Sequence, residues 1–177
     1  MFGMNIAIRT ASPEDRDEWV RLRWELWPDC PAERHSLEMV QILGLPGMVA
    51  LAFVDQKLTG FAEVSVRSDH VEGTVSSPVP YLEGWYVQPA HRGQGVGRAL
   101  ISYVEQWARS NGYSEIASDA EIQNSRSIRL HSRLGFREVS RTVHFVKTLG
   151  NQTAEQTRCS EPGETAVVDN RGSAAPL

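Results

Sequence analysis

The chain has 177 residues and a net charge of −4 at pH 7, with 41% hydrophobic and 23% charged residues. This length and composition predict one globular domain, and the acidic balance argues against a nucleic-acid partner. No apolar run reaches the ~18 residues of a membrane span, no signal peptide is evident, and the two cysteines form neither a metal-ligand spacing nor a disulfide framework, so we expect a cytoplasmic protein.

The first half of the chain predicts two helices and four strands. Ser12, followed by Pro13 and Asp15, is a typical helix start, and this helix should end at Pro28 with Trp19 on its buried face. The other elements of this half are, in order, a strand over 5–9, a helix over 33–43, strands over 48–54 and 58–66, a polar loop over 67–80 and a strand over 81–87.

The second half predicts a longer amphipathic helix and a polar tail. Apolar residues recur at helical spacing over 96–110, and Gly112 should end that helix. The other elements are, in order, a strand over 115–120, a helix over 125–134 and strands over 136–140 and 142–147. Beyond residue 150 large apolar residues almost disappear, so we expect one domain over 1–149 and a disordered tail over 150–177.

The stretch HRGQGVGRALISYVEQWA, residues 91–108, places a glycine-rich turn directly before the long helix. Gly93, Gly95 and Gly97 remove side chains where free backbone N–H groups meet the positive end of the helix dipole. A phosphate or pyrophosphate suits such a place, and Arg92 and Arg98 add positive charge. The pattern is neither G-x-x-x-x-G-K-[ST] nor G-x-G-x-x-G, so by itself it leaves open a turn without a ligand.

Two signatures resemble those of the GNAT superfamily of acyl-CoA-dependent N-acetyltransferases. The run Arg92-Gly93-Gln94-Gly95-Val96-Gly97 matches R/Q-x-x-G-x-G/A, and Asn124 with LHSRLGF (130–136) is similar to N-x-x-[AS]-x-x-[LF]-[YH]-x-x-x-G-F. The resemblance covers roughly residues 5–149. It implies an α/β (α+β) GNAT fold, with a mixed central sheet of about seven strands, splayed between strands 4 and 5 and flanked by about four helices.

The resemblance also implies acetyl-CoA as co-substrate, held in that splay. The strand backbone would bond the pantetheine arm as another strand does, and the amides of the glycine turn would bind the pyrophosphate. The implied cofactor-binding residues are Trp85, Tyr86, Val87, Arg92, Gly93, Gln94, Gly95, Val96, Gly97, Arg98, Asn124 and His131.

Four further segments resemble one branch of the superfamily, the aminoglycoside 6'-N-acetyltransferases. They are LRWELWPDCP (22–31), SVRSDHVEG (65–73), SSPVPYLEGWYVQPAHR (76–92) and IASDAE (116–121). An aminoglycoside carries several ammonium groups, and segments 25–38 and 69–83 contain several carboxylates and no lysine. Most of these carboxylates can equally be surface groups. Glu83 and Asp119 differ, because a carboxylate inside an apolar strand needs a partner or a function.

The branch implies roles for individual side chains. Trp27 and His70 match positions that face the aminoglycoside, although Trp27 can also be a core aromatic and His70 replaces the tyrosine common in the branch. Glu83 and Asp119 match carboxylates that bind amines near the reactive nitrogen. A further acidic contact of the branch falls on Ser140 here, with Glu138 two residues earlier on the same face.

The acceptor amine must attack as a neutral amine, so the site needs a base or an environment that lowers the pKa of the amine. Asp119 is the first candidate to accept the proton and Glu83 the second, but both can instead only bind ammonium groups. The Val87 N–H should stabilise the tetrahedral oxyanion. His131, where most GNAT enzymes carry a tyrosine, either protonates the leaving thiolate or only contacts the cofactor. The five histidines are scattered, so no metal is expected.

The sequence therefore predicts an acetyl-CoA-dependent aminoglycoside 6'-N-acetyltransferase that works by direct attack in a ternary complex and gives antibiotic resistance. The resemblance further implies a homodimer. Two alternatives remain: an acetyltransferase for another polyamine or a protein N-terminus, and a non-catalytic acyl-CoA-binding module. The acidic segments favour a cationic small molecule, and the presence of Glu83 and Asp119 favours catalysis.

Overall fold

The computed structural model describes residues 5–148 of the chain. Residues up to Thr142 belong to one unit, and residues 143–148, which belong to a second unit, contain no helix or strand. The tail predicted over 150–177 lies outside the described residues, and the boundary at residue 149 stays a prediction.

The first unit alternates strands and helices. Its elements are, in order, β1 (Ile6–Thr10), η1 (Pro13–Asp15), α1 (Arg16–Leu26), α2 (Ala32–Gly44), β2 (Gly47–Val54), β3 (Lys57–Arg67), β4 (Val79–Val87), η2 (Pro89–His91), α3 (Val96–Ser110), β5 (Ala117–Ser118) and α4 (Ser125–Arg133). The five strands form one mixed sheet in chain order, antiparallel from β1 to β4 and parallel between β4 and β5.

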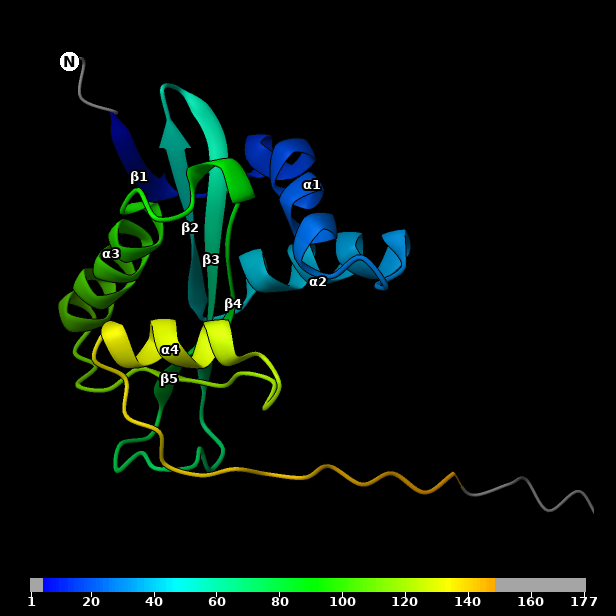
Figure 1. Ribbon diagram of the computed structural model, residues 1–177. Helices are drawn as coiled ribbons and strands as arrows, with labels where there is room; N and C mark the ends of the chain where they lie inside the picture. Colours follow the sequence, from blue (N-terminus) through cyan, green and yellow to red (C-terminus); the bar gives the residue numbers. More distant parts are fainter. Residues whose placement is uncertain (1–4, 149–177) are drawn as a thin grey trace, which may run out of the picture. The chain divides into compact units, whose positions relative to one another are not determined.

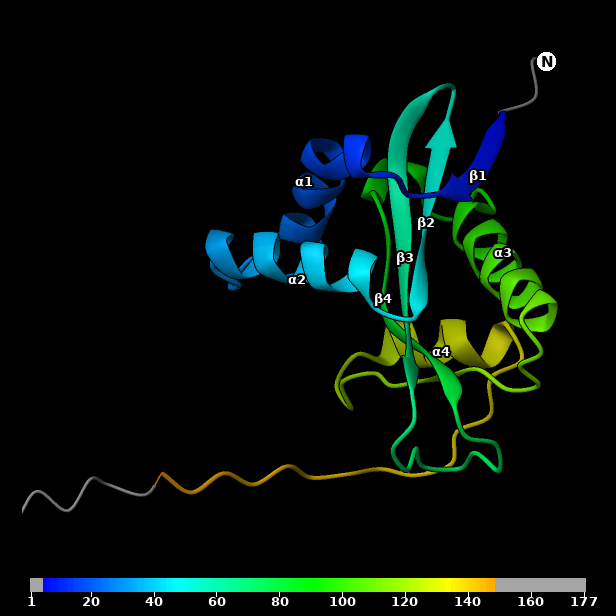
Figure 2. The ribbon, with the colours of Figure 1, turned by 180° about the vertical axis from the view of Figure 1, so that it is seen from behind.

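Strand β2 shows how the sequence builds two cores. Successive side chains of a strand point to opposite faces, and nearly every residue of β2 is buried. Met48 and Ala50 join one core with the apolar face of α3, whereas Val49 and Leu51 join a second core with α1 and α2. The sheet is therefore covered on both faces. Figures 1 and 2 show α1 and α2 on one side of the sheet and α3 on the other.

Most predicted elements are confirmed with bounds that differ by one or two residues. Helix α3 spans the predicted residues, and Gly112, just past its end, has a φ angle of 81° in the left-handed region. The predicted start of the first helix is also present, because the Ser12 N–H donates to Asp15 Oδ2 at 2.8 Å. The hairpin turn between β2 and β3 places Asp55 and Gln56 at positive φ.

The strands after β4 are the part of the prediction that is wrong. The strand expected over 115–120 shrinks to Ala117–Ser118, and no strand forms over 136–140 or 142–147. The described residues thus contain five strands rather than about seven. The physical reason is the lack of a partner: β5 spans only two residues, so its outer edge offers few backbone groups to a following strand.

Candidate active site

Strand β4 separates from β5 shortly after the two strands pair. Their parallel pairing covers only two rungs, Tyr81 with Ala117 and Leu82 with Ser118. On the other side of β4, the register with β3 shifts so that Glu83 becomes the extra residue of a β-bulge. A bulge bends its strand and increases the local twist. The edge of β4 beyond Leu82 is therefore open, which confirms the predicted splay between strands 4 and 5.

The backbone groups of Trp85 and Val87 face this opening. Gln88 N donates to Thr59 O of β3 at 2.8 Å, and backbone groups of successive strand residues point to opposite sides. Val87 therefore faces away from β3, in agreement with its carbonyl accepting a hydrogen bond from Arg92 Nε at 2.7 Å. An extended ligand can pair with the Trp85 and Val87 N–H groups as another strand would.

The glycine turn follows β4 directly. Gly93 and Gly95 have φ angles of 76° and 90°, in the left-handed region that favours glycine. A Cβ at either residue would meet no atom within 4 Å, so conformation rather than crowding explains these two glycines. Gly95 is also the N-cap of α3, whose first N–H groups have no partner within the helix. These groups, with the positive end of the helix dipole, suit an anion such as a pyrophosphate.

Gly97 has a different explanation. A Cβ there would lie 2.8 Å from Cζ2 of Trp85, so the first turn of α3 packs directly against the indole ring. Among the described residues, Trp85 Nε1 is a buried donor without a hydrogen-bond partner. A buried unpaired donor costs about 1–3 kcal/mol. A ligand carbonyl that accepts from this N–H therefore fits the opening.

The other side chains predicted to hold the cofactor also shape the turn. Arg92 binds the Val87 carbonyl, and Gln94 Nε2 donates to Ala90 O at 2.8 Å. Val96 is buried in the core, which leaves its backbone N–H as the group that can face a ligand. Arg98 is exposed. The turn therefore offers mainly backbone donors, with the exposed side chain of Arg98 beside them.

Tyr86 and Asn124, both predicted cofactor contacts, have structural partners. The Tyr86 hydroxyl donates to Glu25 Oε2 at 2.7 Å, and burial, reinforced by Glu25, raises the pKa of Tyr86 to about 12. Tyr86 belongs to the core under α1 and α2, away from the edge that opens toward β5. Asn124 caps α4, because its Oδ1 accepts from Ser127 N at 3.0 Å.

Helix α4 carries His131 beside the opening. Its ring makes edge contacts with Trp85 and Phe136, at centroid distances of 5.8 and 5.1 Å. Nε2 lies 3.1 Å from Ser118 Oγ, and Nδ1 lies 2.9 Å from Ser127 O. His131 thus sits at the last rung that joins β4 to β5.

Glu83 is held by two groups of β3. Arg67 donates to both of its carboxylate oxygens, at 3.0 and 2.7 Å, and Ser65 Oγ donates at 2.5 Å. The Arg67 guanidinium also lies over the Tyr81 ring, 3.3 Å from its centroid. Although burial acts to lower it, the hydrogen bonds to Glu83 leave the pKa of Arg67 raised. Glu83 therefore has a cationic partner already.

Asp119 lies on the same side of the opening. Burial raises the pKa of the Tyr81 hydroxyl, and the charge of Asp119 raises it further, so the two groups are close. Asp119 is exposed, and no ion-pair partner for it appears within residues 5–148. The structure thus brings Glu83 and Asp119 together around Tyr81 and Arg67. The negative charge of Glu83 is balanced by Arg67, whereas that of Asp119 has no such partner within residues 5–148.

Trp27, at the end of α1, covers β4 next to the bulge. A Cβ on Gly84 would lie 2.5 Å from Cη2 of Trp27, so the indole lies directly on the backbone of that glycine. Phe61 flanks the ring at a centroid distance of 6.1 Å. Trp27 is half-buried, which leaves part of the ring available next to Glu83.

A buried polar network supports Trp27 from below. The Arg23 guanidinium lies 4.7 Å from the centroid of the Trp27 ring, and it pairs with Glu63 and with Glu38. Trp19 Nε1 donates to the other oxygen of Glu63 at 2.9 Å. Burial raises the pKa of Glu63 to about 7, although Arg23 and Trp19 act in the opposite direction.

Two other predicted acceptor contacts lie in exposed segments. The His70 side chain is 78% exposed, and its nearest carboxylate is Glu72 at 3.7 Å. Glu138 pairs with Arg141 at 2.6 Å, and that hydrogen bond lowers the pKa of Glu138. Their roles toward an acceptor stay predictions.

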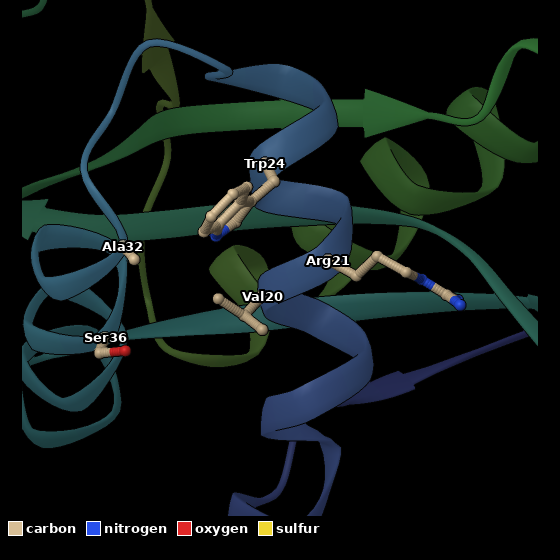
Figure 3. A pocket seen from close by; sticks show the side chains of 5 residues that line it. All are labelled: Val20, Arg21, Trp24, Ala32 and Ser36. Carbon is tan, nitrogen blue, oxygen red and sulfur yellow. The ribbon is translucent and has the colours of Figure 1, made fainter.

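Two surface hollows lie elsewhere on the unit. One, of about 360 Å³, lies between α1 and α2 and is lined by Val20, Arg21, Trp24, Ala32 and Ser36 (Figure 3). The other, of about 460 Å³, is lined by Glu18, Arg21, Glu25, Gln56, Lys57, Leu58, Thr59, Gln88 and His91. Neither hollow is lined by Glu83, Asp119 or His131.

Within residues 5–148, no group of three or more histidine, cysteine, aspartate or glutamate side chains is arranged to hold a metal ion. None of the helices in this range is both long enough and apolar enough to cross a membrane.

A family model described as the Acetyltransferase (GNAT) family matches residues 16–136 of the chain. The chain belongs to the GNAT acetyltransferase family. The first predicted signature, residues 92–97, maps to the glycine turn and the start of α3 in this GNAT chain. The residues from Asn124 to Phe136 carry the second signature, on and around α4.

Known relatives of this GNAT chain have closely related names. The aminoglycoside N(6')-acetyltransferase type 1 of Stenotrophomonas maltophilia is 46% identical over 140 residues, which cover 78% of this chain and 90% of that protein. The enzyme of the same name from Serratia marcescens is 45% identical, over 77% of this chain and 95% of that protein. The solved structure of AAC(6')-Iy with the bisubstrate analogue CoA-S-monomethyl-acetylneamine has a TM-score of 0.78 and 36% identity, covering 82% of this chain and 99% of that one.

Three residues next to the site were not predicted from the sequence. Arg67 falls just outside the acidic segment 69–83. The pattern that could have indicated it is its spacing from Ser65: the two residues are two positions apart on β3, so their side chains share one face of the sheet. Arg23 lies on the same predicted helix as Trp19, and an arginine on a helix carries no signal of a buried ion pair. Ser118 directly precedes Asp119 but carries no motif of its own.

Proposed function

We propose that this GNAT chain is an aminoglycoside 6'-N-acetyltransferase that takes its acetyl group from acetyl-CoA and so gives resistance to these antibiotics. The observation that carries the proposal is the opening beyond Leu82, which has backbone donors on one side and Glu83 and Asp119 on the other. Relatives 45–46% identical carry that enzyme name, and an AAC(6') structure of the same fold was solved with a CoA-linked aminoglycoside analogue.

The donor half of the proposed site would hold acetyl-CoA, which supplies an activated acetyl thioester. The N–H groups of Trp85 and Val87 are free to pair with the pantetheine arm, and the amides at Gly93, Gly95 and the start of α3 suit the pyrophosphate. The unpaired Trp85 Nε1 offers one more donor. This fit comes from this chain's own atoms and does not depend on its relatives.

The acceptor half is suited to a cation. Asp119 is exposed beside the last β4–β5 rung, and Glu83 lies on the bulge that opens the sheet. Carboxylates at these two positions can bind ammonium groups of the acceptor and orient the amine that reacts. Trp27 offers an aromatic surface next to Glu83, and His70 and Glu138 are further candidate contacts.

The remaining chemistry needs an oxyanion donor and a proton acceptor. The Val87 N–H, which faces the opening, is the proposed oxyanion donor. A carboxylate that binds an ammonium group stabilises the charged amine and so opposes its deprotonation. We therefore assign to Asp119 and Glu83 the binding of the ammonium groups of the acceptor. Either carboxylate is the proton acceptor only where the site offers no other base.

Release of CoA thiol from acetyl-CoA, measured with kanamycin as acceptor, tests the proposal. We expect turnover with aminoglycosides that have a free 6'-amine and none with amikacin or gentamicin variants blocked at that amine. Turnover with both kinds would move the reaction to another amine. Tight binding of acetyl-CoA without turnover of any aminoglycoside would leave the non-catalytic binding module, and turnover only with another polyamine or a peptide N-terminus would leave the alternative acetyltransferases.

A homodimer in the cytoplasm is part of the proposal. The resemblance to the aminoglycoside branch supports the dimer, and α2 exposes Leu37, Val40 and Leu43, apolar side chains that a second copy can cover. Sedimentation velocity of the full chain at several concentrations measures the oligomeric state. A single monomeric species at micromolar concentration would contradict the dimer without affecting the enzyme assignment.

A further inference from the structure

His35, on α2, is a completely buried side chain that contacts the end of α1. Arg23 Nε of α1 donates to Nδ1 of His35 at 3.3 Å. A guanidinium can only donate hydrogen bonds, so Nδ1 must accept and carries no hydrogen. The ring hydrogen is therefore on Nε2, which lies 3.3 Å from the backbone oxygen of Trp27. His35 thus donates a hydrogen bond to Trp27.

The Trp27 carbonyl needs such a donor because α1 ends there. The residue four positions on, which would donate to this carbonyl if the helix continued, is Pro31, which has no N–H. Trp27 has φ −125° and ψ 71°, and its oxygen accepts from Cys30 N at 3.2 Å and from His35 Nε2. These two bonds fix the direction in which the backbone leaves α1, and with it the bond that carries the indole.

The same buried network holds the indole ring itself. The Arg23 guanidinium lies 4.7 Å from the centroid of the Trp27 ring. His35 takes the hydrogen of Arg23 Nε, while Glu63 and Glu38 pair with the two terminal nitrogens. Because each of its three nitrogens is bound, the guanidinium has one place beside the ring. His35 therefore acts on Trp27 twice, directly at the carbonyl and through Arg23 at the ring.

We propose that His35 is a positioning residue for the acceptor half of the site. By fixing Trp27, it places the indole on Gly84, directly beside Glu83, and so sets the affinity for the acceptor. It is buried, so it acts through Trp27 and not on an acceptor. This inference rests on the proposed function, in which Trp27 offers its ring to the acceptor.

Two amide variants separate this role from a role in the core alone. The N–H of a glutamine side chain reaches as far as Nε2, so His35→Gln keeps a donor for Trp27 O, whereas the shorter amide of His35→Asn keeps only an acceptor for Arg23. Both variants remove the ring that stacks on Trp24, so both should lower the melting temperature. We expect the acceptor KM to rise about tenfold in His35→Asn and to stay within about twofold of the wild type in His35→Gln.

The kcat and the KM of acetyl-CoA should change less than twofold in both variants, because the donor half is untouched. Met39→Ala is the control for stability: Met39 lies one turn further along α2 in the same core and has no hydrogen to donate. It should lower the melting temperature without raising the acceptor KM. Equal acceptor KM values in His35→Gln and His35→Asn would overturn the proposal.

A double variant tests whether His35 acts through Trp27. In a Trp27→Ala background, His35→Asn should raise the acceptor KM no further, since the ring that it positions is gone. A further rise as large as that in the wild-type background would contradict the proposal.

The tautomer is measured on the wild type, without any substrate. The chain has five histidines, so nitrogen-15 NMR of histidine-labelled full-length protein at about pH 8 resolves few rings, and His35→Gln identifies the signal. We expect Nε2 of His35 to resonate as a protonated nitrogen and Nδ1 as an unprotonated one. The opposite tautomer would overturn the proposal, because Nε2 could not then donate to Trp27.

Failure of this proposal and failure of the proposed function are distinguishable. Wild-type protein that acetylates spermidine but not kanamycin contradicts the aminoglycoside assignment. The two amide variants are then compared with spermidine as acceptor, and their KM ratio decides the role of His35 in the same way.

Discussion

The two halves of the opening between β4 and β5 are built in opposite ways. The donor half is one short run of backbone, from Gly93 to the first turn of α3. The acceptor half is a set of side chains from separate elements: Trp27 ends α1, Arg67 ends β3, Glu83 lies on the bulge of β4, and Asp119 follows β5.

Because of this difference, the two halves should respond to different kinds of substitution. A backbone site depends on φ angles and on the absence of Cβ atoms, so changes of charge nearby should affect it little. A side-chain site depends on charge and on how the elements pack, so it should respond to changes far away in the sequence. Substitutions in one half should therefore alter the kinetics of one substrate only.

The largest effect is expected from Asp119→Asn. The exposed carboxylate loses the charge that attracts an ammonium group, and a charge-assisted hydrogen bond is worth about 1.5–3 kcal/mol. We expect kcat/KM for a cationic acceptor to fall roughly 100-fold, mainly through KM, in steady-state assays. Glu121→Gln, two residues further on and also exposed, is the control that should change little. A rise in the KM of acetyl-CoA instead would mean that the two halves are not separate.

Gly95→Ala should give the next largest effect, on the other half. The φ angle of 90° is strained for alanine by about 1–2 kcal/mol, and relief of that strain would move the N–H groups at the start of α3. We expect the KM of acetyl-CoA to rise about tenfold with the acceptor KM unchanged. Gly112→Ala is a matched control, because Gly112 has a φ angle of 81° beyond the other end of α3. It should lower the melting temperature similarly but leave the KM unchanged; an equal rise in both variants would assign the effect to helix stability.

Gly84→Ala should affect the acceptor half through packing alone. The new Cβ would lie 2.5 Å from the Trp27 ring, and overpacking of this kind costs about 1–3 kcal/mol. We expect a lower melting temperature and a severalfold higher acceptor KM, because the ring must move away from Glu83. In Gly84→Ala/Trp27→Phe the stability loss should be smaller than the sum of the two single losses. Additive losses would show that ring and glycine do not interact.

The smallest expected effect is a pH dependence of stability at Glu63, below the acceptor half. Its pKa is raised by burial from the ordinary 4.5 to about 7, so between these values the unfolded chain has lost a proton that the folded chain retains. The stabilising contribution is complete below about pH 4.5 and is lost as the pH rises through about 7. We expect the melting temperature of the wild type to decline over this range more than that of Glu63→Gln. Identical slopes in the two proteins, measured by calorimetry, would contradict the raised pKa.

The donor half could be predicted almost completely from the sequence, and the acceptor half only in part. Gly93, Gly95 and the start of α3 follow each other in the chain, so their spacing alone indicates a glycine turn that opens a helix. That this turn binds an anion stays a prediction. Glu83 and Asp119 were predicted to act because each was expected inside an apolar strand, but only Glu83 lies within one; Asp119 is exposed just past the end of β5. Their cationic neighbour Arg67 was not recognised, because β3 and β4 must pair before it can reach Glu83.

Residues 136–147 show that a local pattern can also predict an element that does not form. Residues 136–147 alternate as strands do, yet they form none, because a strand needs a neighbouring edge and β5 provides only two residues. The sequence by itself determined the helices and the glycine turn, since each depends on residues that are near in the chain. It also indicated the first four strands through their apolar runs, although their pairing joins residues as distant as Ile6 and Val54. The tertiary structure alone decided the pairing of Glu83 with Arg67, the pairing of Arg23 with Glu63 and the meeting of Ser118 with His131. Each of these contacts joins residues whose distance in space is set by sheet register and helix packing, which no local pattern encodes.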